Sequence, residues 1–379
     1  MTGPHSTGLA AMPSHSSGGV NCPGVTARLA EDGLRPESVI GDMSISELTA
    51  EDQEGIAKTN DGDWFRSLGY AGTYSSSPAQ RVCFVRDSEK RIVDACFYRE
   101  LQRFKVFNEI QVQGRVSSES MAVKHLLATR KPALIHLSWL RAEDIQSVGT
   151  LGLRFSVQQM ADDFLIDLPP SEQEYLDRLG GKTRKHLPYY VRRMEREWGS
   201  DVAFSSLVGH EISRELFDRV LELNRKRMER RGKRSGWSSE IVEQRWPLVQ
   251  EYGLLVGVHH RGTLVASTLS FVHGRDAYLI VLAHEPEFDR LNMGNIVLWM
   301  TLKHLIRMRL RCYHLMWGAS FYKRQFGGKS EPLFRATAFA SPFYAMVWRA
   351  GQKLQIPFLF ALPRKVWQRI EVVHAHAPQ

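Results

Sequence analysis

The sequence predicts an α+β protein built from two copies of one module. Each copy shows the same order of elements, namely a hairpin, a strand, a loop with a glycine, a helix and a final strand. The chain has 379 residues, and at roughly 150 residues per domain this length accommodates two cores. Its 43% apolar and 24% charged residues are typical of globular proteins and exclude collagenous and wholly disordered chains.

The first copy begins with two β-rich segments, Val82–Val85 and Ile92–Tyr98, which flank the polar turn Asp87–Lys90. Short β-rich runs around a polar turn predict a hairpin. The elements that follow are an extended segment at 104–110, a loop with Gly114, a helix at about 118–128 and a strand at 133–140.

The second copy repeats this order with different residues. A hairpin is predicted for Leu254–His259 and Leu264–Val272 around Arg261 and Gly262. The elements that follow are a strand at 278–283, a loop with Gly294, a helix to about residue 308 and a strand at 313–316.

The boundary between the copies is marked by Pro169 and Pro170, which end a predicted strand at 164–168. Ser171 and Glu174 form an S-x-x-E capping box that starts a helix. We therefore expect a disordered leader at 1–40, a first module at 41–165, a second module at 166–350 and a basic and aromatic tail at 351–379.

Positive charge is concentrated in two runs. Residues 182–196 hold six Lys or Arg and one acid, and residues 225–234 hold seven Lys or Arg and one acid. The whole chain carries +9. Such concentration indicates an anionic ligand, carrier or surface. Solvated helix ends and nucleic acid are the alternatives, although no motif of a dedicated nucleic-acid domain is present.

Two loops in the second copy combine features that suit chemistry. Gly294 lies where a strand turns into a helix, so backbone N–H groups there can hold an anion such as a phosphate. Tyr322 and Lys323 follow the last strand of this copy, which places a phenol and an ammonium at the end of the strand where ligands usually bind. Structural turns are the alternative for both loops.

From about residue 80 to 350 the chain resembles double-module acyltransferases of the GNAT superfamily, in the CelD-like or BioF-like acetyltransferase branch related to the FemAB peptidyltransferases. The stretches that carry the resemblance are Ile166–Pro169 with Lys182–Lys185, Leu221–Asn224 with Arg227, Phe288–Gly294, and Tyr322–Lys323 with Phe326–Gly327. The resemblance implies two tandem GNAT-like modules, each a mixed and mostly antiparallel sheet flanked by helices. It also implies that the first module, with only Gly114 and Arg115 at the matching loop, is degenerate.

The resemblance further implies transfer of an acyl group from acyl-CoA to an amine or hydroxyl by direct attack. On this basis Tyr322 is the candidate general acid, Lys323 and a backbone N–H of the strand at 278–283 are oxyanion donors, and Glu285 is the candidate base, with His284 as runner-up. Residues expected to hold acyl-CoA are Arg290, Asn292, Met293, Gly294 and Asn295, and those expected to bind an anionic acceptor are Lys182, Arg184, Lys185 and Arg227. We expect His304 to be a core histidine, because it lies on an apolar helical stripe.

We expect a cytoplasmic enzyme that can be peripheral to the inner face of the membrane and that acts on a small-molecule or carrier-linked acceptor in envelope or polysaccharide biosynthesis. The alternatives are a FemAB-like transferase that uses aminoacyl-tRNA, and a noncatalytic accessory protein of polysaccharide synthesis. No metal is expected, since no HExxH motif and no pairing of H-x-E with C-x-x-C is present. Four scattered cysteines indicate no disulfide framework.

Overall fold

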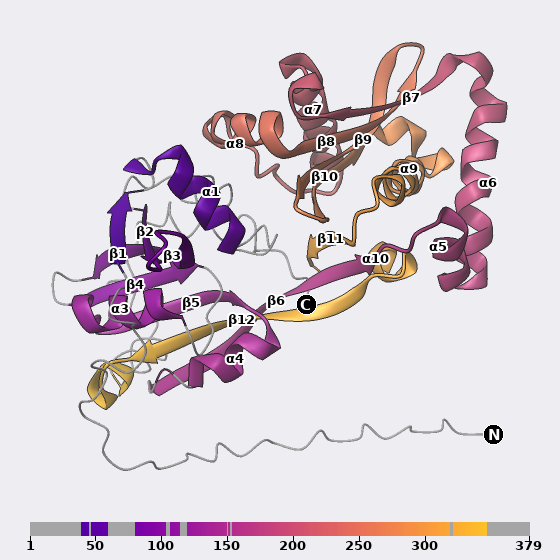
Figure 1. Ribbon diagram of the computed structural model, residues 1–379. Helices are drawn as coiled ribbons and strands as arrows, with labels where there is room; N and C mark the ends of the chain where they lie inside the picture. The colour runs from indigo at the N-terminus through magenta and orange to yellow at the C-terminus, as the bar shows by residue number, and fades with distance from the viewer. Residues whose placement is uncertain are drawn as a thin grey trace, which may run out of the picture.

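The computed structural model describes residues 39–44, 47–59, 80–103, 107–113, 120–149, 151, 154–318 and 321–346. One mixed sheet of 12 strands runs through this part of the chain in the order β1-β2-β3-β4-β5-β12-β6-β11-β10-β9-β8-β7. Figure 1 shows the two halves of the sheet joined through β6 and β12. The predicted α+β class with two modules is therefore confirmed.

Within the described residues, helices α1, α3 and α4 pack on the first half of the sheet. Its elements are β1 (Val39–Ser44), α1 (Ala50–Thr59), β2 (Gln80–Arg86), β3 (Ile92–Arg103), β4 (Phe107–Gln113), α3 (Met121–Arg130), β5 (Leu134–Leu140) and α4 (Ala142–Gly149). Alternating side chains separate its two faces. Ile110, Ile135 and Leu137 pack with α3 and α4, whereas Val82, Phe84 and Phe97 pack with α1. The elements expected within the described residues are present, and β1, α1 and α4 were not anticipated.

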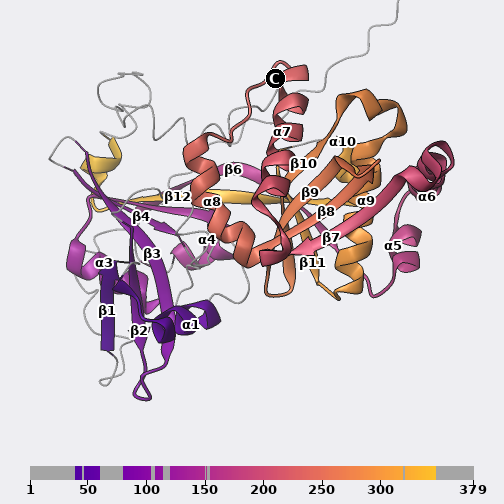
Figure 2. The same ribbon diagram turned by 90° about the horizontal axis from the view of Figure 1, so that it is seen from above.

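The second half has helices on both faces of the sheet. Its elements are β6 (Arg154–Asp167), α5 (Glu172–Arg178), α6 (Gly181–Trp198), β7 (Val202–Val208), α7 (Arg214–Arg230), α8 (Ser239–Tyr252), β8 (Gly253–His260), β9 (Thr263–His273), β10 (Asp276–His284), the 3₁₀ turn η5 (Pro286–Leu291), α9 (Met293–Arg307), β11 (Cys312–Trp317), α10 (Phe321–Gln325) and β12 (Lys329–Phe339). One core packs α7 and α8 on the sheet, and two further cores pack α5, α6 and α9 on its other face, as Figure 2 shows from above.

The predicted capping signal before α5 is confirmed. The Ser171 hydroxyl accepts a hydrogen bond from the Glu174 backbone N–H at 3.2 Å. This cap satisfies one of the first amide groups of the helix, which have no partner inside it.

The two modules exchange their last strands. Strand β6 follows the first module in sequence but pairs with β11 of the second, while β12 follows the second module but pairs with β5 of the first. The two exchanged strands also pair with each other along residues 154–165 and 329–339. The predicted boundary between residues 165 and 166 falls inside β6 and stays a prediction.

Several expectations concern parts of the chain outside the described residues. The leader lies there, except that Val39 and Ile40 belong to β1. The tail at 351–379, Gly114 and Arg115 lie there as well. Among the cysteines, Cys83, Cys96 and Cys312 are buried and free.

Candidate active site

A parallel strand pair opens at the centre of the second module. Strands β10 and β11 pair only at Asp276–Tyr278 with Cys312–His314, although β10 continues to His284. Beyond Tyr278 the side of β10 that faced β11 has no ladder partner, so backbone groups become available to a ligand. The backbone N–H group predicted as an oxyanion donor belongs to this part of β10. In the first module β4 stays paired with β5 through Gln113, the last described residue of that strand.

Arg227 of α7 lies at the mouth of this opening. Its guanidinium interacts electrostatically with Asp289, in η5 after β10, and with Tyr322, in α10 after β11. The Nε atom is buried and has no hydrogen-bond partner in the part of the chain that the structure describes. Burial and the neighbouring Arg231 both lower the pKa of Arg227. A partly buried guanidinium beside a second arginine is a strong site for an anion.

Tyr322 stays protonated in this environment. Burial raises the pKa of the phenol, while Arg227 and Arg231 act in the opposite direction. The ring packs against the core beneath α5, α6 and α9. A protonated phenol beside two guanidinium groups can donate a proton to a leaving group.

Lys323 is 3% exposed, in contrast to the exposed ammonium expected of a surface turn. Its Nζ atom donates to the backbone oxygen of Met316 at 2.8 Å and lies 5.3 Å from the centre of the Phe164 ring. Burial lowers the pKa of Lys323 to about 8, and Asp163 opposes this shift. Met316 itself adopts a left-handed conformation, with φ of 61° at the end of β11.

Glu285 joins α7 to the end of β10. Its Oε1 atom accepts from Arg219 at 2.7 Å and from Lys226 at 2.8 Å, and its side chain is 12% exposed. Arg230 adds a hydrogen bond to the backbone oxygen of Pro286 and an ion pair with Asp289. Arg219 and Lys226 therefore both bind the carboxylate of Glu285, the residue predicted from the sequence as the base.

His284, the runner-up, occupies a different position. Its Nε2 atom lies 2.7 Å from Oδ1 of Asp289, and its buried Nδ1 atom has no hydrogen-bond partner. Burial lowers the pKa of His284, Asp289 opposes this, and Arg227 and Arg231 lower it further. The imidazole is thus neutral near pH 7, and its contact with Asp289 orients it.

The expected phosphate-binding loop forms the start of α9. Asn292 adopts a left-handed conformation with φ of 61°, and the N–H groups of Asn295 and Ile296 return to its backbone oxygen. The amides of Met293 and Gly294 begin the first turn of a 15-residue helix, where N–H groups lack partners inside the helix. These two amides fit an anion such as a diphosphate.

Side chains of the same loop fit a diphosphate less well. Arg290 is exposed and paired with Glu197 of α6, and the Met293 side chain is fully buried in the core. A Cβ atom at Gly294 would lie 3.5 Å from the His284 ring, an ordinary contact, and no left-handed φ requires glycine here. The backbone of this loop, more than its side chains, is suited to the donor.

Three of the four residues expected to bind the acceptor lie apart from Arg227, on the first turns of α6. Lys182, Arg184 and Lys185 are exposed there, and Arg184 is 3.5 Å from Asp177. His304 is only half-buried, and its ring makes no hydrogen bond within the described residues, so the expected hydrogen-bonded core histidine was wrong.

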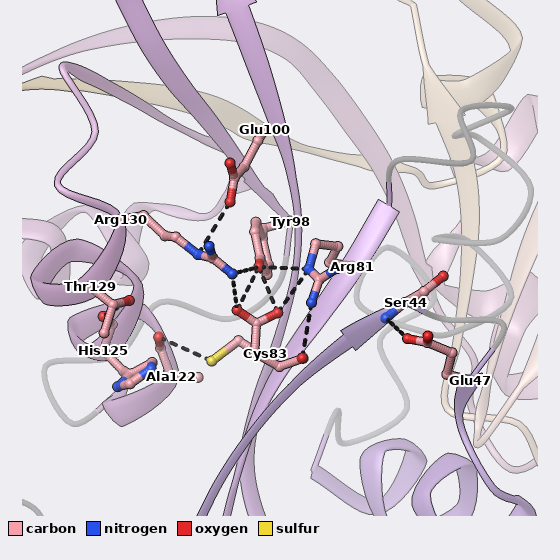
Figure 3. Close-up of polar contacts among 11 residues, drawn as sticks. Ser44, Glu47, Arg81, Cys83, Tyr98, Glu100, Ala122, His125, Thr129 and Arg130 are labelled. Carbon is pink, nitrogen blue, oxygen red and sulfur yellow. Dashed lines mark hydrogen bonds and ion pairs between the residues drawn. The ribbon is translucent and has the colours of Figure 1, made fainter.

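The first module has a polar cluster of its own, shown in Figure 3. The Tyr98 hydroxyl lies 2.6 Å from Asp42, and Arg81 and Arg130 both bind the same carboxylate. Glu100 pairs with Arg130 at 3.3 Å, so two cations face two carboxylates. This neutral network connects β1, β2 and β3 to the end of α3, and its charges balance one another.

A family model described as "Acetyltransferase (GNAT) domain" matches residues 181–324. This range holds the opening between β10 and β11, the start of α9 and Lys323. This part of the chain is therefore similar to GNAT acetyltransferase domains. A search of curated protein sequences finds no match.

Solved structures show the same fold beyond this GNAT domain. A crystal structure of FemX aligns with a TM-score of 0.61 and 11% identity, covering 81% of this chain and 99% of FemX. The structure of L-PGS from Bacillus licheniformis aligns with a TM-score of 0.53 and 14% identity, covering 82% and 97%. A conserved protein of unknown function from Bacteroides thetaiotaomicron aligns at 0.54 and 10%, covering 77% and 98%. The two-module GNAT fold is thus shared over both halves of the chain.

Among the described residues, no cluster of His, Cys, Asp and Glu side chains is arranged to hold a metal ion. No helix in the described ranges is both long and apolar enough to span a bilayer.

Proposed function

We propose that the second module transfers an acyl group from acyl-CoA to an amine or hydroxyl of an anionic acceptor, a precursor in envelope or exopolysaccharide biosynthesis. The observation that supports this proposal is the partly buried guanidinium of Arg227 near the opening between β10 and β11, whose buried Nε atom has no hydrogen-bond partner within the described residues. A buried donor without a partner is costly, so a cationic site that keeps one suits a ligand of opposite charge. A phosphate or carboxylate of the acceptor satisfies it.

Acyl-CoA supplies a thioester, and the residues of this chain would act on it as follows. The backbone amides of Met293 and Gly294 bind the diphosphate. A backbone N–H of β10 beyond Tyr278, together with Lys323, stabilises the charge that develops on the acyl oxygen. For Lys323 this requires that the ammonium leave the Met316 carbonyl or share its protons with it.

The proton movements complete the transfer. As the acceptor nitrogen or oxygen bonds to the acyl carbon, the carbon–sulfur bond breaks and Tyr322 gives its proton to the departing sulfur. The acceptor loses one proton, for which His284 is better suited than Glu285. His284 has a ring nitrogen without a partner and is oriented by Asp289, whereas Glu285 is held by two cations.

Donor binding is tested at Asn295, a partly exposed residue in the first turn of α9. Asn295→Asp adds a negative charge there with little change of shape, and it favours the helix because acids are stabilising near helix N-termini. Acetyl-CoA should raise the unfolding midpoint of the wild type, and at least tenfold more should be needed for the same shift in Asn295→Asp. Asn295→Ser is the neutral control. Equal affinity for acetyl-CoA in all three proteins would show that the donor does not bind at the start of α9.

The proton roles are tested by turnover. Tyr322→Phe should lower kcat by roughly 100-fold, in the range of a lost general acid, without loss of acetyl-CoA binding. His284→Gln keeps a donor for Asp289 but loses the proton acceptor, so the acidic limb of the pH–rate profile should disappear. Glu285→Gln should keep that limb. Loss of that limb in Glu285→Gln and its retention in His284→Gln would instead identify Glu285 as the base.

A second candidate is transfer of an aminoacyl group from tRNA, as in the FemAB relatives. The alignment with FemX over nearly its whole length supports it, as does the loop before α9, whose one arginine, Arg290, is paired with Glu197. Stabilisation by charged tRNA and by no acyl-CoA would favour this candidate. Stabilisation by neither would favour a noncatalytic accessory protein.

A further inference from the structure

One side of α6 is a continuous row of cations. The buried side chains of this helix are Thr183, Leu187, Met194 and Trp198. At about 100° of rotation per residue, the opposite side carries Lys182, Lys185, Tyr189, Arg192, Arg193 and Arg196 within an arc of roughly 100°. We call these six residues the basic stripe. It extends for about 21 Å, given a rise of about 1.5 Å per residue.

The charge of the basic stripe is not compensated within the described residues. Lys182, Lys185, Arg192 and Arg196 form no ion pair there, and Arg193 has only a longer-range interaction with Glu197. Some other cations of this module differ in this respect. Arg178, Arg184, Arg214 and Arg225 each pair with a carboxylate on their own or an adjacent helix.

The acids of α6 lie outside the basic stripe. Glu195 and Glu197 fall about 100° and 90° from its centre at helical spacing, and Glu197 is paired with Arg290. A helix that separates its charges in this way projects a positive field toward solvent in one direction. Conventional solvated helices mix both signs along a face.

The shape of the surface favours a flat partner. Figure 1 shows α6 at one edge of the molecule, outside the sheet and its other helices. A convex rod touches a plane along its whole length, whereas it meets the rounded backbone of an RNA duplex over a few phosphates, and the deep groove of such a duplex does not admit side chains. Tyr189, 44% exposed in the middle of the basic stripe, is a residue type enriched at membrane–water interfaces.

We propose that the basic stripe docks the protein onto a bilayer that contains anionic lipid. The apolar side of α6 is packed inside the protein, so the helix does not insert and the attraction is electrostatic. Binding is therefore reversible and weakens with salt, since charges are screened beyond about 10 Å at 0.1 M. This surface role is independent of which donor the enzyme uses.

The test is flotation of the full chain with vesicles of phosphatidylcholine alone or with 30 mol% phosphatidylglycerol, the probe for anionic lipid. The variant replaces Lys182, Lys185, Arg192 and Arg196 by Gln. The matched control replaces, in the same way, four exposed cations outside the basic stripe that form ion pairs, namely Arg91, Arg261, Arg307 and Lys329. The control therefore removes the same net charge as the variant.

The wild type and the control should float with anionic vesicles within twofold of each other, and neither should float with phosphatidylcholine. The basic-stripe variant should bind at least tenfold more weakly, while its far-UV circular dichroism stays unchanged. Equal binding by the variant and the wild type, or no binding to anionic vesicles at 0.1 M salt, would overturn the proposal. A duplex RNA probe bound through these four residues without vesicle binding would overturn it in favour of nucleic acid.

Discussion

The Nδ1 atom of His314 lies 2.7 Å from Oδ2 of Asp163, across the strand pair β11 and β6. Asp163 is fully buried, and its Oδ1 atom has no hydrogen-bond partner. The His314 ring stacks on Tyr278 at 4.2 Å, and these two residues form the last pair before β10 and β11 separate. Arg141, after β5 of the first module, reaches to 3.9 Å of Asp163. The contact between His314 and Asp163 thus links the point where β10 and β11 separate to β6, one of the two strands that connect the modules.

Removal of the Asp163 charge should destabilise the protein. Asp163→Asn leaves the imidazolium of His314 with a weaker partner in a buried site, for which a loss of about 3 kcal/mol in the free energy of unfolding is expected. Urea unfolding measures it. Asp177→Asn, which breaks the exposed contact with Arg184, is the control and should change stability by less than about 0.5 kcal/mol. Similar effects of the two substitutions would contradict a structural role for Asp163.

His314 should make stability depend on pH. Burial alone would lower its pKa, but the hydrogen bond with Asp163 and the carboxylate of Asp276, 3.9 Å from Nε2, raise the pKa well above the ordinary value. The stabilisation is complete below about pH 6.5, the unfolded value, and is lost as pH rises through the folded pKa. The difference in unfolding free energy between wild type and His314→Gln should therefore shrink as pH increases above 6.5. A constant difference would show that His314 does not titrate there.

Lys323 should give the opposite slope at higher pH. Because its folded pKa is about 8 and an unfolded lysine titrates near 10.4, the unfolded chain binds more protons between these values. Stability should rise with pH from about 8 to 10.4 through this group. Lys323→Met should lose that rise, and the comparison of urea midpoints at pH 7.5 and 9.5 measures it. A slope that survives in Lys323→Met would assign the titration to another residue.

Arg227→Met should separate activity from stability. The substitution removes a buried charge whose Nε atom has no partner, so the unfolding midpoint should stay the same or rise. Loss of the anion contact should raise KM for an anionic acceptor by at least tenfold. Arg225→Met on the exposed side of α7 is the control and should leave KM unchanged. A large fall in stability of Arg227→Met would instead indicate a structural role.

Gly294→Ala should be tolerated. Its Cβ would lie 3.5 Å from the His284 ring, and the backbone needs no left-handed φ, so the free energy of unfolding should stay equal or rise by up to about 1 kcal/mol. Gly209→Ala is the contrast. There φ is +50° and the Cβ would lie 2.8 Å from the Gln250 carbonyl, so a loss of about 2 kcal/mol is expected. Thermal unfolding of both variants measures these changes in stability. If Gly294→Ala lost as much stability as Gly209→Ala, the contacts at Gly294 would not account for the loss.

Much of the fold could be predicted because its signals are local. The hairpin around Arg261 and Gly262, the strand–loop–helix at Gly294 and the cap at Ser171 each depend on residues close in sequence. The proximity of Tyr322 and Lys323 to the end of β11 followed from the same logic.

Strand β12 could not be predicted from such signals. It holds Pro332, and its apolar and polar residues alternate only from Phe334 to Ala338. Its partners Leu134–Leu140 lie about 200 residues earlier. The pairing is decided by which strand edge is free after both modules fold, since an unpaired edge in a sheet is costly. The exchange of β6 and β12 is therefore a property of the assembled sheet.

The sequence by itself determined the element order of the two modules, the concentration of cations in two runs and the residue types at the candidate active site. Tertiary structure decided the environment of each group. It buried Lys323 and the Nε atom of Arg227, gave Glu285 two cations, turned His284 toward Gly294 and aligned one basic run opposite the buried side of α6. The reason is physical: burial and charge partners come from residues distant in sequence, and these two terms set whether a side chain is ionised, paired or open to a ligand.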